Sequence, residues 1–201
     1  MKTFGFHSRE VLQSKSYSGN SSYKYVEHLF KTSKSIDIIT PYLGLYYARM
    51  LVDFAGKGKR IRAIIASGQD TNSETIRYLK HNVRGNIGYA GIAAVSFLLF
   101  IALYLYGLPY ESIIFLAIFL LTAVLASRRG PTKGIITVRY APMFVHEKIY
   151  VGDSKAITGS ANLTYSGMHK NTEYLEIIGD ANKAKALGKH FNTLWNSSRN
   201  V

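Results

Sequence analysis

One short run of this chain carries side chains that are suited to chemistry. It reads H-E-K-I-Y-V-G-D-S-K-A-I-T-G-S-A-N and places His146, Lys148 and Asp153 in an H-x-K-x4-D spacing. Side chains two apart on a strand point to the same face, so His146 and Lys148 are expected side by side at one edge of a sheet. A second short strand then ends in a small-residue turn that adds Ser160 and Asn162. Imidazole, ammonium, hydroxyl and carboxamide groups together suit a phosphodiester.

The surrounding sequence alternates segments typical of strands with segments typical of helices. Strands are predicted over residues 35–42, 59–66, 134–140, 144–151, 155–159 and 173–178, and helices over 46–55, 74–82 and 181–197. The last helix is expected to bury a stripe formed by Leu187, Phe191, Leu194 and Trp195. This alternation predicts an α/β sandwich in which helices cover the sheet.

The run resembles the HKD signature of the phospholipase D superfamily, including its trailing G-S-x-N. Five residues separate Asp153 from Gly159, one fewer than in many members, which predicts a shorter hairpin. The resemblance implies a phospholipase D-like α/β/α sandwich. Residues 1–85 and 128–201 would be the two halves of one catalytic domain, and residues 86–127 would be an insertion between them.

The resemblance also implies a covalent mechanism for hydrolysis. A neutral His146 would attack phosphorus to give a phosphohistidine, which water would resolve, while a second histidine serves as general acid. The phosphate oxygens would be held by Lys148, Ser160 and Asn162. No cofactor and no metal are expected. Because the sequence contains no second H-x-K, the second histidine is expected from a partner in a homodimer.

A carboxylate should orient the catalytic histidine, as the acid does in a Ser-His-Asp triad. Glu173 matches the downstream acid of the family once the shorter hairpin is allowed for, and Glu176 is the alternative. Asp153 is expected to support the site through hydrogen bonds.

The insertion is strongly apolar. Neither residues 86–106 nor residues 112–127 contain a charged side chain, and Gly107-Leu108-Pro109 separates the two segments. A helix over residues 86–106 would span about 31 Å, close to the thickness of the hydrocarbon core of a bilayer. The alternative is a hairpin buried in a large core, but about 160 remaining residues offer too little surface to cover two such helices. The sequence therefore predicts a transmembrane helical hairpin.

Basic residues flank this hairpin, whereas its tip has none. The flanking residues are Arg77, Lys80, Arg84, Arg128, Arg129 and Lys133. This bias predicts that both flanks, and hence the catalytic domain, face the cytoplasm. The absence of cysteine agrees with a reducing compartment.

The chain is basic, with 25 lysines and arginines against 12 acidic residues and a formal net charge of +13. Such a field attracts polyanions, which favours a nucleic acid as substrate. A dense basic cluster and several tyrosines near basic residues agree with this; the cluster is Lys57, Lys59, Arg60 and Arg62, and the tyrosines are Tyr17, Tyr23, Tyr25, Tyr42, Tyr46 and Tyr47. One alternative is an anionic phospholipid such as cardiolipin, and another is a membrane scaffold that binds anions without turnover.

Other chemistries lack their motifs. A zinc site is not expected, because the chain has no cysteine and no H-x-x-x-H pair. There is no G-x-x-x-x-G-K-[ST] loop for a nucleotide, and Ser160 does not lie in the G-x-S-x-G of a serine hydrolase.

Overall fold

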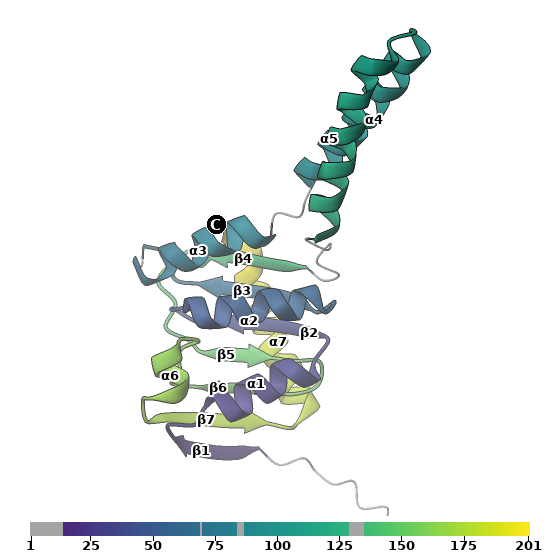
Figure 1. Cartoon of the computed structure of the whole chain (residues 1–201). Helices are drawn as coiled ribbons and strands as arrows, with labels where there is room; N and C mark the ends of the chain where they lie inside the picture. Colours follow the sequence, from purple (N-terminus) through teal and green to yellow (C-terminus); the bar gives the residue numbers. More distant parts are fainter. Residues whose placement is uncertain (1–13, 69, 84–86, 129–134) are drawn as a thin grey trace, which may run out of the picture.

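The computed structural model describes residues 14–68, 70–83, 87–128 and 135–201. In these ranges one mixed sheet has the strand order β1-β7-β6-β5-β2-β3-β4-β8 (Figure 1). Its strands are β1 (Lys15–Gly19), β2 (Ser35–Ile39), β3 (Arg60–Ile65), β4 (Ile136–Tyr140), β5 (Ile149–Val151), β6 (Ala156–Gly159), β7 (Glu173–Ile178) and β8 (Arg199–Asn200). The helices are α1 (Tyr23–Thr32), α2 (Leu45–Gly56), α3 (Asp70–Val83), α4 (Ile87–Leu105), α5 (Pro109–Arg128), α6 (Tyr165–His169) and α7 (Ala181–Ser197).

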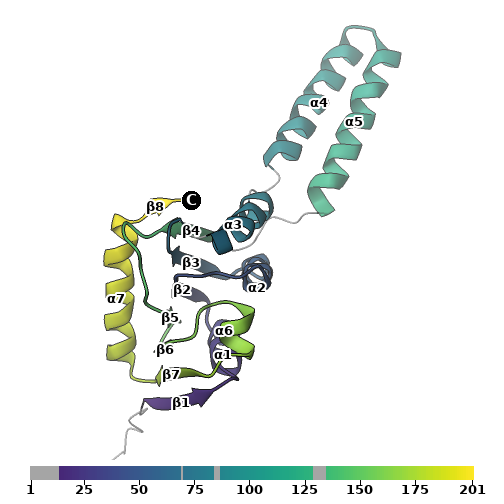
Figure 2. The same cartoon turned by 90° about the vertical axis from the view of Figure 1, so that its left-hand side faces the viewer.

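The sheet is covered by helices on both faces. Figure 2 shows α1, α2, α3 and α6 on one face and α7 on the other. The larger core cluster includes Phe30, Tyr47 and Tyr150, which are fully buried. The second cluster includes Phe191 of α7, against which Trp195 packs. The predicted α/β sandwich is therefore confirmed.

The central strands are parallel, and the strands on the β5–β7 side of the sheet are antiparallel. Strand β2 pairs in parallel with β3, and β3 with β4. Parallel strands covered on both faces are rich in aliphatic residues, as the sequences S-I-D-I-I of β2 and R-I-R-A-I-I of β3 are. Strands β5, β6 and β7 form an antiparallel meander that joins the parallel part through β2.

The sequence-based elements differ from the structure mainly at short or edge segments. The strand predicted over 144–151 begins only at Ile149, and β1, α1, α6 and β8 were not predicted. Strands β1 and β8 lie at the two edges of the sheet, where a strand buries too little to show a clear hydrophobic pattern. Helix α1 does carry a signal, since Val26, Leu29 and Phe30 are buried at helical spacing.

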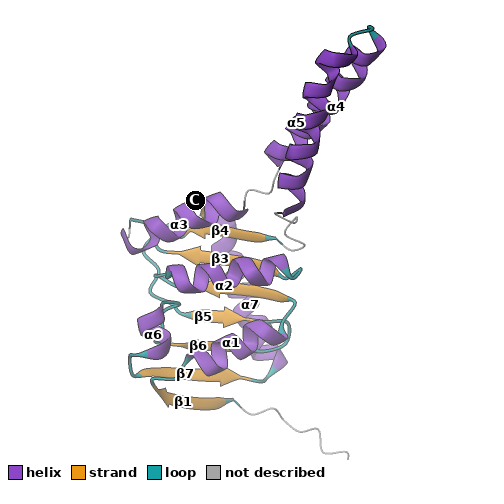
Figure 3. Cartoon of the chain, in the orientation of Figure 1, coloured by secondary structure: helices purple, strands orange, loops and turns teal. Residues whose placement is uncertain are grey.

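Residues 86–127 were predicted to form a helical hairpin, and α4 and α5 confirm the two helices. They lie side by side and extend away from the sheet (Figures 1 and 3). Gly107 has a φ of +79° at the turn, a conformation that favours glycine. Many large apolar side chains on both helices are exposed, among them Leu98, Leu105 and Leu121.

The transmembrane part of that prediction is not supported. Within the residues that the structure describes, no helix combines the length and the apolarity needed to cross a bilayer. The 19 residues of α4 rise about 28 Å, somewhat less than a hydrocarbon core of about 30 Å. Of the flanking basic residues, Arg84, Arg129 and Lys133 lie outside the described residues.

Candidate functional site

Four segments that are distant in sequence meet where β2 and β6 end and where β5 and β7 begin. This edge is formed by the ends of the strands and not by an outer strand of the sheet. Ile39, at the end of β2, pairs with Ile149 at the start of β5. Ile149 also pairs with Thr158 near the end of β6, and the neighbouring Gly159 pairs with Leu175 near the start of β7. This edge is the carboxyl end of the parallel strands, where open α/β sheets commonly bind ligands.

His146 and Lys148 lie together at this edge, as the spacing predicts. Both precede β5 rather than lying within it. The ammonium of Lys148 lies 3.1 Å from Nε2 of His146 and donates to the carbonyl oxygen of the same residue at 2.7 Å. Lys148 is only 4% exposed, whereas the His146 side chain is exposed. A buried cation therefore supports an imidazole that solvent or a substrate can reach.

Glu173 is the buried acid of the site. It opens β7 and is 8% exposed. One carboxylate oxygen accepts a very short hydrogen bond from the Ser160 hydroxyl, and the other accepts from the Asn171 amide at 3.2 Å. The same Ser160 oxygen accepts from the backbone N–H of Tyr174 at 3.0 Å. Because a hydroxyl has one proton, this arrangement commits Ser160 to Glu173 and not to a phosphate, contrary to the predicted phosphate-binding role.

Lys148 and Glu173 interact electrostatically. Burial lowers the pKa of the Lys148 ammonium below its usual value of 10.5, and the nearby charge of Glu173 opposes that shift. No hydrogen bond joins Glu173 to His146 among the described residues, so the expected orienting contact is not present in this arrangement. Glu176 is three positions along the same strand, and the odd spacing puts it on the opposite face. Of the two candidate acids, Glu173 is the one at the site.

Asn162 follows β6 and carries an unsatisfied group. Its side-chain oxygen is buried and has no hydrogen-bond partner among the residues that the structure describes. A buried acceptor without a donor is uncommon in native proteins, and it marks a place where a ligand can supply the missing proton. The backbone around it is tight, since a Cβ on Gly167 would lie 2.6 Å from the Asn162 carbonyl oxygen. Asn162 therefore remains a candidate for contact with substrate.

The loop that carries Asn162 is held by residues that the sequence analysis did not identify. The Tyr150 hydroxyl donates to the carbonyl oxygen of Ala161 at 2.7 Å, and the Thr40 hydroxyl accepts from the Leu163 N–H at 3.2 Å. Both side chains are fully buried, and burial raises the pKa of Tyr150. A signal was available for Tyr150, which lies two positions after Lys148 and so continues the same face of the strand.

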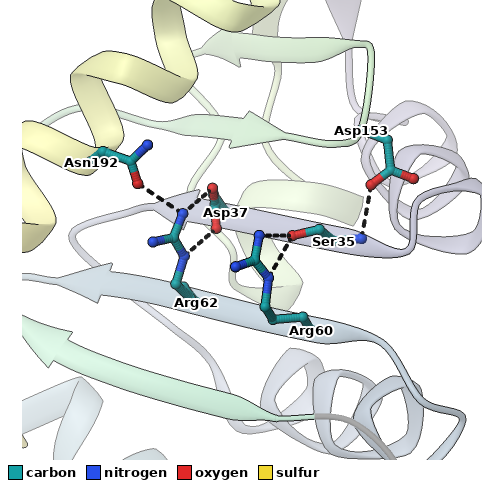
Figure 4. A network of polar contacts seen from close by, with 6 residues as sticks. All are labelled: Ser35, Asp37, Arg60, Arg62, Asp153 and Asn192. Carbon is teal, nitrogen blue, oxygen red and sulfur yellow. Dashed lines mark hydrogen bonds and ion pairs between the residues drawn. The ribbon is translucent and has the colours of Figure 1, made fainter.

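Asp153 does not lie at this edge. It occupies the turn at the opposite end of β5, which is closed by a hydrogen bond from Gly152 N–H to the carbonyl oxygen of Lys155 at 2.8 Å. Its carboxylate accepts from the backbone N–H group of Ser35 at 2.9 Å (Figure 4). It also accepts from the backbone N–H group of Lys34 at 2.8 Å. The tight turn agrees with the predicted short hairpin. The expected supporting hydrogen bonds are present, but they anchor β5 and β6 to the start of β2 and do not involve the residues at the other end of β5.

The predicted basic cluster also lies away from the site. Arg62 forms a paired contact with Asp37 at 2.7 and 2.8 Å and donates to Asn192 of α7, while Arg60 donates to the Ser35 hydroxyl (Figure 4). These side chains hold β2, β3 and α7 together. No group of three or more histidine, aspartate or glutamate side chains in the described ranges is placed to hold a metal ion.

Comparisons with known proteins agree with this geometry. Residues 125–195 match the sequence model of the family described as "Cardiolipin synthase, PLD-like domain". Nuc, a phospholipase D family member from Salmonella typhimurium, is 16% identical, with a TM-score of 0.57 over 94% of this chain and 99% of that one. NucT from Helicobacter pylori is 12% identical, with a TM-score of 0.58 over the same shares of the two chains.

A larger protein shares the same fold over part of its length. Phosphatidylserine synthase from Haemophilus influenzae Rd KW20 is 15% identical, with a TM-score of 0.51 over 94% of this chain and 39% of that one. Such identities show likeness of fold. No protein with a curated function matches the chain.

Proposed function

Since the chain belongs to the phospholipase D superfamily, we propose that it hydrolyses phosphodiester bonds and that its preferred substrate is a nucleic acid. The observation that carries the proposal is the pairing of an exposed His146 imidazole with the buried Lys148 ammonium, 3.1 Å from its Nε2. A nucleophile and a fixed positive charge at this separation can contact one phosphate group together.

The proposed reaction has two steps. The Nε2 atom of neutral His146 forms a bond to phosphorus, the bond from phosphorus to the leaving oxygen breaks, and a second protonated histidine gives that oxygen its proton. Water then forms a bond to phosphorus as the Nε2–phosphorus bond breaks, and the second histidine takes the proton of the water. The Lys148 ammonium and the side-chain N–H of Asn162 are proposed to donate hydrogen bonds to the nonbridging oxygens. Glu173 keeps a negative charge close to Lys148.

The second histidine is proposed to come from a partner subunit. Two copies related by a two-fold axis at this edge would bring His146 of one protomer opposite the partner's copy of the same residue. A homodimer would then contain one composite site. A monomer with full activity would contradict this arrangement.

A nucleic acid is favoured by the charge of the chain. The net charge of +13 attracts a polyanion. The alternative substrate is an anionic phospholipid, which the description of the matching family favours. Either substrate presents the same phosphodiester to His146.

We also propose that the α4–α5 hairpin attaches the domain to a membrane, with the domain on the cytoplasmic side. The support is the exposed apolar surface of both helices and the absence of charged residues from α4. The basic residues Arg77 and Lys80 on α3, before the hairpin, favour the cytoplasmic side. Flotation of the full chain with liposomes tests attachment, and deletion of residues 87–128 should abolish it. Protease protection of a reporter fused to the chain tests the side.

Purified full-length protein incubated with single-stranded DNA, RNA or anionic liposomes tests the substrate. Cleavage of DNA or RNA that is lost in His146→Ala is the expected result. A phosphorylated His146 peptide should also be found in wild-type protein that is quenched rapidly and kept at alkaline pH, where the phosphorus–nitrogen bond is stable. Loss of headgroup from the liposomes with intact nucleic acid would instead favour the lipid. A protein that cleaves none of them, although folded and dimeric, would contradict the proposed function.

A further inference from the structure

Aromatic side chains from α1, α2 and α6 gather next to the Asn162 loop. We propose that one of them, Tyr165, is a base-stacking platform that positions single-stranded nucleic acid for the phosphodiesterase site. This inference rests on the proposed function and assigns part of the specificity of that site to a residue outside the H-x-K motif. Stacking on an aromatic side chain is tolerant of sequence, because every base has a π-face.

Tyr165 is the outer ring of a three-ring stack. The His169 ring lies 4.3 Å from that of Tyr23 with an angle of 15° between their planes. The centre of the same His169 ring lies 4.6 Å from that of the Tyr165 ring, with an angle of 18° between their planes. Tyr165 is nevertheless 49% exposed. A base could therefore extend a stack that the protein has already built.

The middle ring of the stack, His169, is held by hydrogen bonds to the protein. The Nε2 atom of His169 lies 3.1 Å from the Tyr47 hydroxyl, which in turn donates to Glu27 at 3.4 Å. Tyr47 is fully buried, and burial together with the charge of Glu27 raises its pKa, so that it remains a neutral hydrogen-bonding group. A ring that is fixed before the ligand arrives loses little conformational freedom on binding.

The stack is also close to the catalytic edge. Tyr165 begins α6 three residues after Asn162, and Thr164 caps this helix by accepting from the Gly167 N–H at 3.1 Å. A bridge between Leu43 and Leu163 connects this segment to the loop before α2. A strand of nucleic acid stacked on Tyr165 would therefore have its neighbouring phosphates near Asn162.

Two further side chains complete the platform. Tyr46 is 47% exposed and meets Tyr165 edge to face at 5.6 Å, which forms a side wall. The Lys170 ammonium lies over the Tyr165 ring, 5.8 Å from its centre, and is exposed. It can therefore turn to a neighbouring phosphate when a base stacks on the ring. The exposed Lys170 and the net charge of +13 favour a polyanion as the occupant.

The experiment compares a short oligothymidylate with its abasic counterpart, which has the same phosphates and no bases. In full-length Tyr165→Ala we expect KM for the oligothymidylate to rise about five- to hundred-fold, the range that stacking contributes per base, with kcat largely kept. KM for the abasic strand should not change. Tyr165→Trp should retain wild-type behaviour, because it keeps a flat ring. Tyr110→Ala is the matched control, since Tyr110 is also exposed but lies on the hairpin helix α5.

Equal loss on both substrates, or no loss on either, would overturn the platform. So would a change in oligomeric state of Tyr165→Ala in light scattering, because the ring would then belong to a protein interface. Binding of the labelled oligothymidylate by fluorescence anisotropy separates this inference from the proposed function. If the wild type binds in a Tyr165-dependent way without cleaving, the proposed function fails and the platform stands. Binding that is absent or independent of Tyr165 would reject the platform.

Discussion

The Lys148 ammonium lies 3.1 Å from Nε2 of His146, and it is the lysine that is buried. The lysine also donates to the carbonyl oxygen of the same histidine at 2.7 Å, which fixes the direction in which its charge points. The positive charge is thus built into the protein next to the proposed nucleophile, where it can stabilise charge that develops on a phosphate.

Replacing Lys148 should separate stability from activity. Burial lowers the pKa of this lysine in the folded protein below its usual value of 10.5. The unfolded chain therefore binds the lysine proton more tightly than the folded protein does. Burying the charge therefore costs stability at neutral pH. Lys148→Met is expected to raise the free energy of unfolding, measured by denaturant titration at pH 7, while kcat falls about a hundredfold or more. A destabilised variant with normal kcat would contradict the role given to Lys148.

Replacing Glu173 should move the alkaline limit of activity. The charge of Glu173 opposes the lowering of the Lys148 pKa, so Glu173→Gln should lower that pKa further. The fall of kcat/KM on the alkaline side should then begin at a lower pH than in the wild type. Glu176→Gln is the control, because Glu176 lies on the opposite face of β7 and should leave the pH profile unchanged. An unshifted profile in Glu173→Gln would show that the two groups are not coupled.

Replacing Asp153 should affect folding and spare turnover. Its carboxylate accepts two backbone hydrogen bonds at the start of β2, far from the catalytic edge. Asp153→Ala leaves both N–H groups without this partner, and a loss of about 1–3 kcal/mol in the free energy of unfolding is expected. At a temperature where the variant is folded, kcat should match the wild type. Ser154→Ala, in the same turn, is the control. A collapse of kcat in folded Asp153→Ala would return Asp153 to the active site.

Mixed dimers should be inactive if two histidines share one site. Co-refolding of equal amounts of wild type and His146→Ala gives about one quarter wild-type dimers, so about a quarter of the activity should remain. Independent sites would leave about half. His190→Ala is a suitable control for mixing, because His190 lies on α7, is also exposed and pairs with Glu147 at 2.7 Å.

The sequence predicted the core of the site because that core depends on local spacing. His146 and Lys148 are two apart and do meet, although the strand begins only at Ile149. The position of Asp153 could not be predicted in this way, because its partners are backbone N–H groups more than a hundred residues earlier. The sequence could not decide between Glu173 and Glu176, because the register of β7 determines which face of the sheet each residue occupies.

Other features required the tertiary structure. The commitment of Ser160 to Glu173 arises where β6 and β7 approach so closely that a Cβ on Gly159 would clash with the Tyr174 carbonyl oxygen. The exposed aliphatic surface of α4 and α5 could be read from composition, but its relation to the rest of the domain could not.

The position of the α4–α5 hairpin in the chain sets its distance along the sheet from His146. Helices α4 and α5 are inserted between α3 and β4. In the sheet, β4 is separated by β3 and β2 from β5, the strand that follows His146 and Lys148. Three strand spacings of about 4.8 Å put the active edge roughly 14 Å along the sheet from the strand next to the hairpin. If the hairpin lies in lipid, a headgroup in the same bilayer reaches His146 only when the domain tips toward the surface. A flexible strand in the aqueous phase reaches it without such a movement.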